Sequence, residues 1–66
     1  SNLERAVTSA RDAAALAQLR FDEGLDDFLD VLDAQRTLLE AEDRLAQNEL
    51  QTTRLAILTY RELGGT

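Results

Sequence analysis

The sequence predicts an all-α protein: an antiparallel helical hairpin of the coiled-coil type, with a short first helix and a long second one. Proline is absent and glycine occurs only at positions 24, 64 and 65, so few residues interrupt a helix. Between Gly24 and Gly64 lie 39 residues that are mostly helix formers. Apolar residues recur there every seven positions, which is the spacing of helices that supercoil.

The first helix is expected at about residues 3–23 and is rich in alanine. Small side chains let two helices approach closely, but they bury little apolar area. We therefore expect this helix to bury only a small apolar area against the second one. Its apolar residues are Leu3, Ala6, Val7, Ala10, Ala13, Ala14, Ala15, Leu16, Ala17 and Leu19.

The turn is expected at residues 22–26, around Gly24. Glycine suits the left-handed backbone conformation that ends many helices. Asp26 or Asp27 can cap the next helix, because a short carboxylate accepts hydrogen bonds from its free N–H groups. Phe21 and Phe28 flank the turn and are expected to pack against each other.

The second helix is expected at about residues 26–63, and at about 1.5 Å per residue it would be roughly 55 Å long. Polar residues interrupt a strict two-stranded seam, so we expect several neighbouring helices. The first helix reaches about half of it, and its exposed apolar residues beyond position 46 predict a further partner. One line of seven-residue steps contains Leu25, Leu32, Leu39, Ala46, Thr53 and Tyr60, and a neighbouring line contains Val31, Leu38 and Leu45.

The composition excludes several classes of function. The chain has 66 residues and a net charge of -6, and all seven of its basic residues are arginine, which argues against general nucleic-acid binding. Cysteine and histidine are absent, which excludes thiol chemistry, zinc sites and histidine catalysis. Two helices form no cleft, and no base accompanies the acids. We therefore expect no enzyme activity, no catalytic residue and no cofactor.

Six acidic residues crowd the turn: Asp22, Glu23, Asp26, Asp27, Asp30 and Asp33. The spacing of Asp26, Asp30 and Asp33 predicts one shared helix face, which could attract a hard cation or line an aqueous opening. Residues 22–33 have the length of a calcium loop, but Gly24 and Asp27 do not fit its third and sixth positions. No metal site is therefore predicted. The plainer interpretation is a solvated tip whose acids favour the start of a helix.

From about residue 16 to residue 65 the sequence resembles the last helical segment of the TolC-like outer-membrane efflux proteins, closest to the lipoprotein branch that serves multidrug pumps. The motif comprises Phe21, Gly24, the "VLDAQ" of residues 31–35, a long alanine and leucine repeat, and the "LGG" of residues 63–65. Each short motif is weak alone. Together, at these spacings, they are fairly specific.

The resemblance implies that residues 1–66 are a single fragment of a periplasmic α-helical tunnel domain. Members of the family are trimers in the outer membrane, and an adaptor protein and an inner-membrane pump work with them. Small molecules leave through the tunnel, and the channel does no chemistry of its own. The turn at residues 22–26 would lie at the periplasmic tip, where the tunnel narrows.

The resemblance also suggests roles for particular residues. Asp30 and Asp33 match carboxylates that line the tip constriction, and Gly24 with Leu25 matches the turn that meets the adaptor. Phe21 stands where part of the family has tyrosine, and Asp26 where some members have arginine. A gate locked by those groups is therefore not expected.

An alternative interpretation is an independent coiled-coil oligomerisation or adaptor module without a channel role. In either case, we expect the isolated chain to self-associate, because half of its second helix is uncovered.

Overall fold

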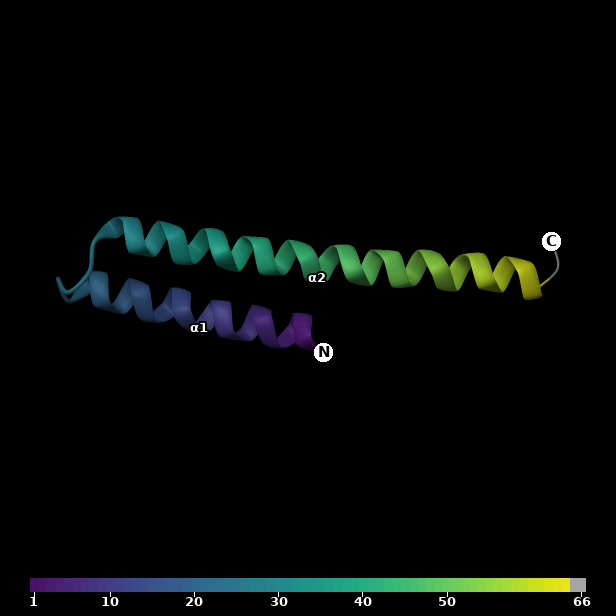
Figure 1. The fold of residues 1–66 in the computed structure, drawn as a ribbon, viewed down its shortest axis with the longest axis horizontal. Helices are drawn as coiled ribbons and strands as arrows, with labels where there is room; N and C mark the ends of the chain where they lie inside the picture. The colour runs from purple at the N-terminus through teal and green to yellow at the C-terminus, as the bar shows by residue number, and fades with distance from the viewer. Residues whose placement is uncertain (65–66) are drawn as a thin grey trace.

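A computed structural model describes residues 1–64 as two antiparallel helices, α1 (Asn2–Asp22) and α2 (Phe28–Leu63), joined by a short turn (Figure 1). The Cα atoms extend over 62 × 17 × 12 Å. This confirms the predicted all-α hairpin, with helix ends no more than two residues from those expected. Gly65, which the family motif includes, lies outside the described residues.

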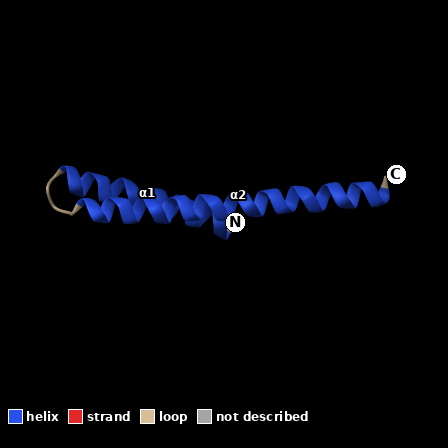
Figure 2. Cartoon of the chain, turned by 90° about the horizontal axis from the view of Figure 1, so that it is seen from above, coloured by secondary structure: helices blue, strands red, loops and turns tan. Residues whose placement is uncertain are grey.

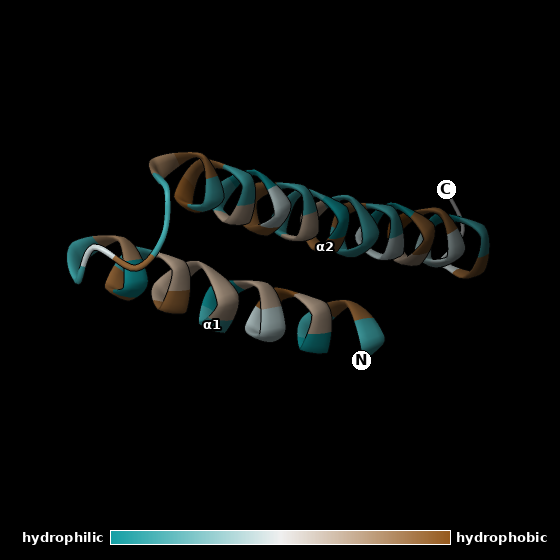
Figure 3. Cartoon of the chain, turned by 60° about the vertical axis from the view of Figure 1, so that its left-hand side comes forward, coloured by the Kyte–Doolittle hydropathy of each residue, from teal (hydrophilic) through white to brown (hydrophobic). Residues whose placement is uncertain are grey.

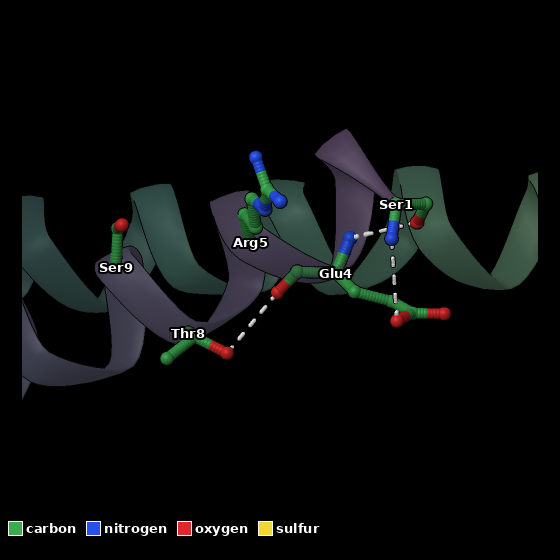
Figure 4. Close-up of a pocket in the computed structure, with 5 residues that line it drawn as sticks. All are labelled: Ser1, Glu4, Arg5, Thr8 and Ser9. Carbon is green, nitrogen blue, oxygen red and sulfur yellow. Dashed lines mark hydrogen bonds and ion pairs between the residues drawn. The ribbon is translucent and has the colours of Figure 1, made fainter.

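The start of α1 is closed by a capping box. The Ser1 hydroxyl accepts a hydrogen bond from the Glu4 amide at 3.2 Å, and the Glu4 carboxylate lies 3.5 Å from the Ser1 amino group (Figure 4). The Thr8 hydroxyl donates to the Glu4 carbonyl at 3.1 Å. Because these groups are satisfied locally, the shallow hollow between them is explained by helix capping.

The interface between α1 and α2 is a narrow seam of small and aliphatic side chains. Val31 is the least exposed side chain of the seam, at 1%, and Val7 and Ala10 are also buried. Along each helix the less exposed residues alternate in steps of three and four, which is the spacing of coiled-coil packing. They are Leu3, Val7, Ala10, Ala14 and Ala17 on α1, and Val31, Ala34, Leu38, Ala41 and Leu45 on α2.

The structure decides which line of α2 meets α1. The line of Val31, Leu38 and Leu45 lies in the seam, whereas Leu32 and Leu39 of the other line are exposed. A step of one residue turns the side chain by about 100°, so two lines one residue apart cannot face the same neighbour.

The second half of α2 has no neighbour within the chain. The N-terminus lies beside the middle of α2 in both views (Figures 1 and 2), and residues 46–64 are all exposed. Apolar turns nevertheless recur along the whole of α2 (Figure 3). Over residues 1–64, neither helix combines the length and the apolar character needed to cross a bilayer.

Candidate functional site

The turn between the helices is fixed by backbone hydrogen bonds. Gly24 has a φ of +76°, and its N–H donates to the Phe21 carbonyl at 2.9 Å. The N–H of Leu25 donates to the Arg20 carbonyl at 2.8 Å. These two bonds form a Schellman motif, which satisfies the last carbonyls of α1 and reverses the chain. Gly24 therefore occupies the left-handed position that the sequence predicts.

An ion pair closes the same turn. Nε of Arg20 donates to Oδ2 of Asp26 at 2.7 Å, and Nη2 of Arg20 donates to Oδ1 at 3.4 Å. The hydrogen bond with Asp26 and the charge of that carboxylate raise the pKa of the Arg20 guanidinium above its usual value. The amide of Asp26 also donates to the Arg20 carbonyl at 3.3 Å, so Arg20 binds Asp26 through both its side chain and its backbone.

The position of Asp26 contradicts part of the sequence analysis. The predicted face of Asp26, Asp30 and Asp33 does not form, because Asp26 lies in the turn before α2 begins. Asp27 is the N-cap of α2, and its carboxylate accepts a hydrogen bond from the Leu29 amide at 3.5 Å. Sequence reasoning missed the pairing with Arg20, since the two residues are six positions apart and are brought together only by the turn.

Large apolar side chains also lie at this turn. The rings of Phe21 and Phe28 lie 5.1 Å apart between centroids, tilted by 56°, which is a favourable aromatic geometry. Leu25 is 62% exposed at the end of the hairpin. The end of the molecule thus presents a leucine beside a tilted aromatic pair, with acidic residues around them.

The two predicted constriction residues lie on the exposed surface of α2. Asp30 is in the first turn of the helix, and Asp33 accepts a hydrogen bond from Nη2 of Arg36 at 2.7 Å. The hydrogen bond with Asp33, followed by the charges of Asp33 and Glu40, raises the pKa of Arg36. Residues 1–64 contain no group of acids arranged to hold a metal ion.

Comparison with known proteins identifies the family. The sequence model of a family described as outer membrane efflux protein matches residues 1–65. The chain therefore belongs to the outer membrane efflux protein family.

Its curated relatives come from Pseudomonas putida. The solvent efflux pump outer membrane protein SrpC and the toluene efflux pump outer membrane protein TtgI are each 41% identical over 51 residues, which are 77% of this chain and 11% of the relative. The pyoverdine export outer membrane protein OpmQ is 36% identical over 62 residues, or 94% of this chain and 13% of that protein. The chain thus spans about a tenth of the length of these relatives. No solved structure matches it.

Proposed function

We propose that this chain is part of the helical wall and the periplasmic tip of a trimeric outer-membrane channel. In this proposal the channel exports small molecules together with an adaptor protein and an inner-membrane pump. Membership of the efflux family supports this role, as do relatives named for solvent, toluene and pyoverdine export. The chain acts as a passive conduit, and no catalytic step is assigned to it.

The observation that carries the proposal is that α2 has apolar stripes on two opposite sides. One stripe is the seam that α1 covers. The other, here named the outer stripe, consists of Leu29, Leu32, Leu39, Leu50, Ile57 and Tyr60, which are between 47% and 76% exposed. At 3.6 residues per turn, the centres of the two stripes are about 130° apart around the helix. A helix with partners on two opposite sides suits a wall that is one helix thick.

The residues at the tip take the roles that the resemblance implies. Asp30 and Asp33 would each occur three times around the axis of a trimer, as rings of carboxylates that attract cations and repel anions. Gly24 and Leu25 would meet the adaptor, since Leu25 is exposed at the end of the hairpin. Phe21 and Phe28, which lie in contact, would hold the turn in shape for that contact.

Leu32→Asp in the longer protein tests the wall assignment. A charge in the outer stripe would be buried against the neighbouring helix, at a cost of several kcal/mol, and the wall would not assemble. We expect cells that depend on this channel to become sensitive to its exported compounds. The channel should also no longer migrate as a trimer. Thr37→Asp, on an exposed position outside both stripes, is the matched control.

Unchanged resistance and an intact trimer with Leu32→Asp would show that the outer stripe faces solvent. The wall assignment would then be wrong, and the independent coiled-coil module would be the better interpretation.

A further inference from the structure

One residue of α1 holds the backbone on both sides of Leu25. The carbonyl of Arg20 accepts a hydrogen bond from the N–H of Leu25 at 2.8 Å and another from the N–H of Asp26 at 3.3 Å. These N–H groups belong to the two peptide groups that flank the Cα atom of Leu25. Because peptide groups are planar and only φ and ψ turn freely, fixing both groups sets the direction of the Cα–Cβ bond of Leu25.

The side chain of Arg20 acts on the same part of the turn. Its Nε and Nη2 atoms donate to the two carboxylate oxygens of Asp26, at 2.7 and 3.4 Å. The Asp26 side chain is 24% exposed, the lowest value in any ion pair within residues 1–64. Solvent therefore weakens this pair less than the others. Through its backbone and its side chain together, Arg20 accepts or donates four hydrogen bonds with Leu25 and Asp26.

The turn needs this cation because its other charged residues are acidic. Arg20 is the only basic residue near the turn, whereas six acids lie at residues 22–33. The hydrogen bond and the charge of Asp26 raise the pKa of Arg20, and the charge of Asp30 raises it further, so Arg20 interacts with more than one of these acids. Without Arg20, the neighbouring acids would repel Asp26, and this repulsion would favour an open turn.

Leu25 itself lies outside the packed seam. Its side chain is 62% exposed, between the end of α1 and the start of α2. An exposed leucine adds little to the stability of the hairpin, so a fixed orientation of this side chain matters mainly to a partner. A binding group that is already ordered loses less conformational entropy when a complex forms.

From these contacts, we propose that Arg20 is a positioning residue for the contact between the turn and the adaptor. Arg20 orients Leu25 through the two peptide groups and through Asp26, and it does not itself touch the adaptor. The proposal rests on the proposed function, in which Gly24 and Leu25 meet the adaptor, and it adds a residue outside the family motif. The turn then docks as a preformed unit.

A charge exchange in the full-length channel tests positioning against direct contact. Isothermal titration calorimetry measures binding of the purified adaptor to the purified channel. Arg20→Glu and Asp26→Arg should each weaken binding by about tenfold, because the turn opens and Leu25 loses its fixed orientation. The double variant Arg20→Glu/Asp26→Arg should recover most of this loss, since the pair forms again with its charges exchanged. Recovery is expected only if the adaptor contacts neither charge directly.

Arg11→Glu is the matched control. It also reverses the charge of an arginine of α1, in an exposed ion pair with Glu42 away from the tip, and should leave adaptor binding unchanged. A double variant that binds as weakly as the single variants would indicate direct contact with the adaptor and overturn the proposal. An equal loss of binding in Arg11→Glu would also overturn it.

Hydrogen exchange gives a second readout that does not involve the adaptor. In the full-length channel alone, the amides of Leu25 and Asp26 should exchange a few-fold faster in Arg20→Glu. Their exchange should return toward the wild-type rate in the double variant. If Arg20→Glu leaves these amides as slow as in the wild type, Arg20 does not orient Leu25.

Leu25→Ala separates this proposal from the proposed function. If Leu25 meets the adaptor, Leu25→Ala should weaken binding by at least about tenfold. Normal binding by both Leu25→Ala and Arg20→Glu would mean that the docking role of the turn is wrong. If Leu25→Ala weakens binding and Arg20→Glu does not, the docking role stands and the positioning role of Arg20 is rejected.

Discussion

At the scale of single residues, the turn depends on one backbone conformation and one ion pair. Gly24 is the only described residue with positive φ, and Arg20 and Asp26 close the turn from its two ends. Both features lie within a few residues of Leu25, the exposed tip. The shape presented at the end of the hairpin is thus set locally and needs no contact from the rest of α2.

Gly24→Ala should destabilise the hairpin by about 1–2 kcal/mol, because a residue with a Cβ is strained at positive φ. A Cβ at Gly24 would meet no atom within 4 Å, so the whole effect comes from the backbone. Urea unfolding followed by circular dichroism measures it. Glu23→Ala is the control, at a neighbouring residue whose φ is -88°. Equal stability of both variants would mean that the turn adopts another conformation.

Asp26→Asn should loosen the turn without unfolding the helices. The amide hydrogens of Leu25 and Asp26, which donate to the Arg20 carbonyl, should exchange a few-fold faster with solvent. Asp33→Asn, which removes the similar exposed pair with Arg36, is the control and should leave these amides unchanged. Exchange rates that are the same in both variants would show that the Arg20 pair does not hold the turn.

The arginine side of this pair sets no pH dependence near neutrality. Its hydrogen bond with Asp26 raises the pKa of Arg20. The associated stability is therefore fully present below the usual pKa of arginine, and is lost only as the pH rises through the raised value in strong alkali. Salt concentration, rather than pH, should change the strength of the Arg20–Asp26 pair, because dissolved ions screen the attraction between exposed charges.

At the scale of the helices, α2 is packed in its first half and uncovered in its second. The seam ends at Leu45, and its positions continue as Asn48, Thr52 and Leu55, which are mostly polar. The side of α2 that faces α1 therefore loses its apolar character beyond the seam. The outer stripe, in contrast, continues through Leu50, Ile57 and Tyr60.

Val31→Ala should destabilise the hairpin by about 1–2 kcal/mol, since Val31 is almost completely buried and the small side chains of α1 cannot fill the space. Thermal unfolding at a concentration where the chain is monomeric measures this change. Leu58→Ala, at an exposed position outside both stripes, should change the stability by no more than a few tenths of a kcal/mol. An equal loss in both variants would contradict the seam assignment.

At the scale of the whole molecule, the core buries too little apolar surface to make the hairpin strongly stable by itself. Among residues 1–64, only Val7, Ala10 and Val31 are buried. A chain of this length buries a small share of its surface and usually needs further support. Neighbouring helices in the proposed channel wall would supply that support.

The proposed constriction role of Asp30 and Asp33 belongs to this scale, because a ring of charge exists only in an assembly. In the full-length channel, replacing Asp30 and Asp33 by alanine should lower the preference for cations and weaken block by divalent cations. Single-channel recording measures both. Asp12→Ala, on α1 away from the tip, is the control. If conductance, selectivity and block all stay unchanged, the two residues do not line the narrow point.

The sequence determined the elements of the fold. The lack of proline, the glycine at position 24 and the seven-residue repeat predict two helices and one turn, with ends within two residues of those observed. These features are local: each depends on the conformational preference of a residue or on the spacing of its neighbours. For the same reason Asp26 and Asp27 could be named as candidate caps before the structure placed Asp27 as the N-cap.

Only the tertiary structure decided how these elements meet. Two lines of apolar residues were visible on the second helix, and the rotation that places Val31 in the seam and Leu32 outside it depends on packing with α1. The pairing of Arg20 with Asp26 likewise required the path of the turn. Sequence spacing determines which residues share a helix face. Which face is buried depends on the shape of the neighbouring helix, and a linear pattern does not contain that shape.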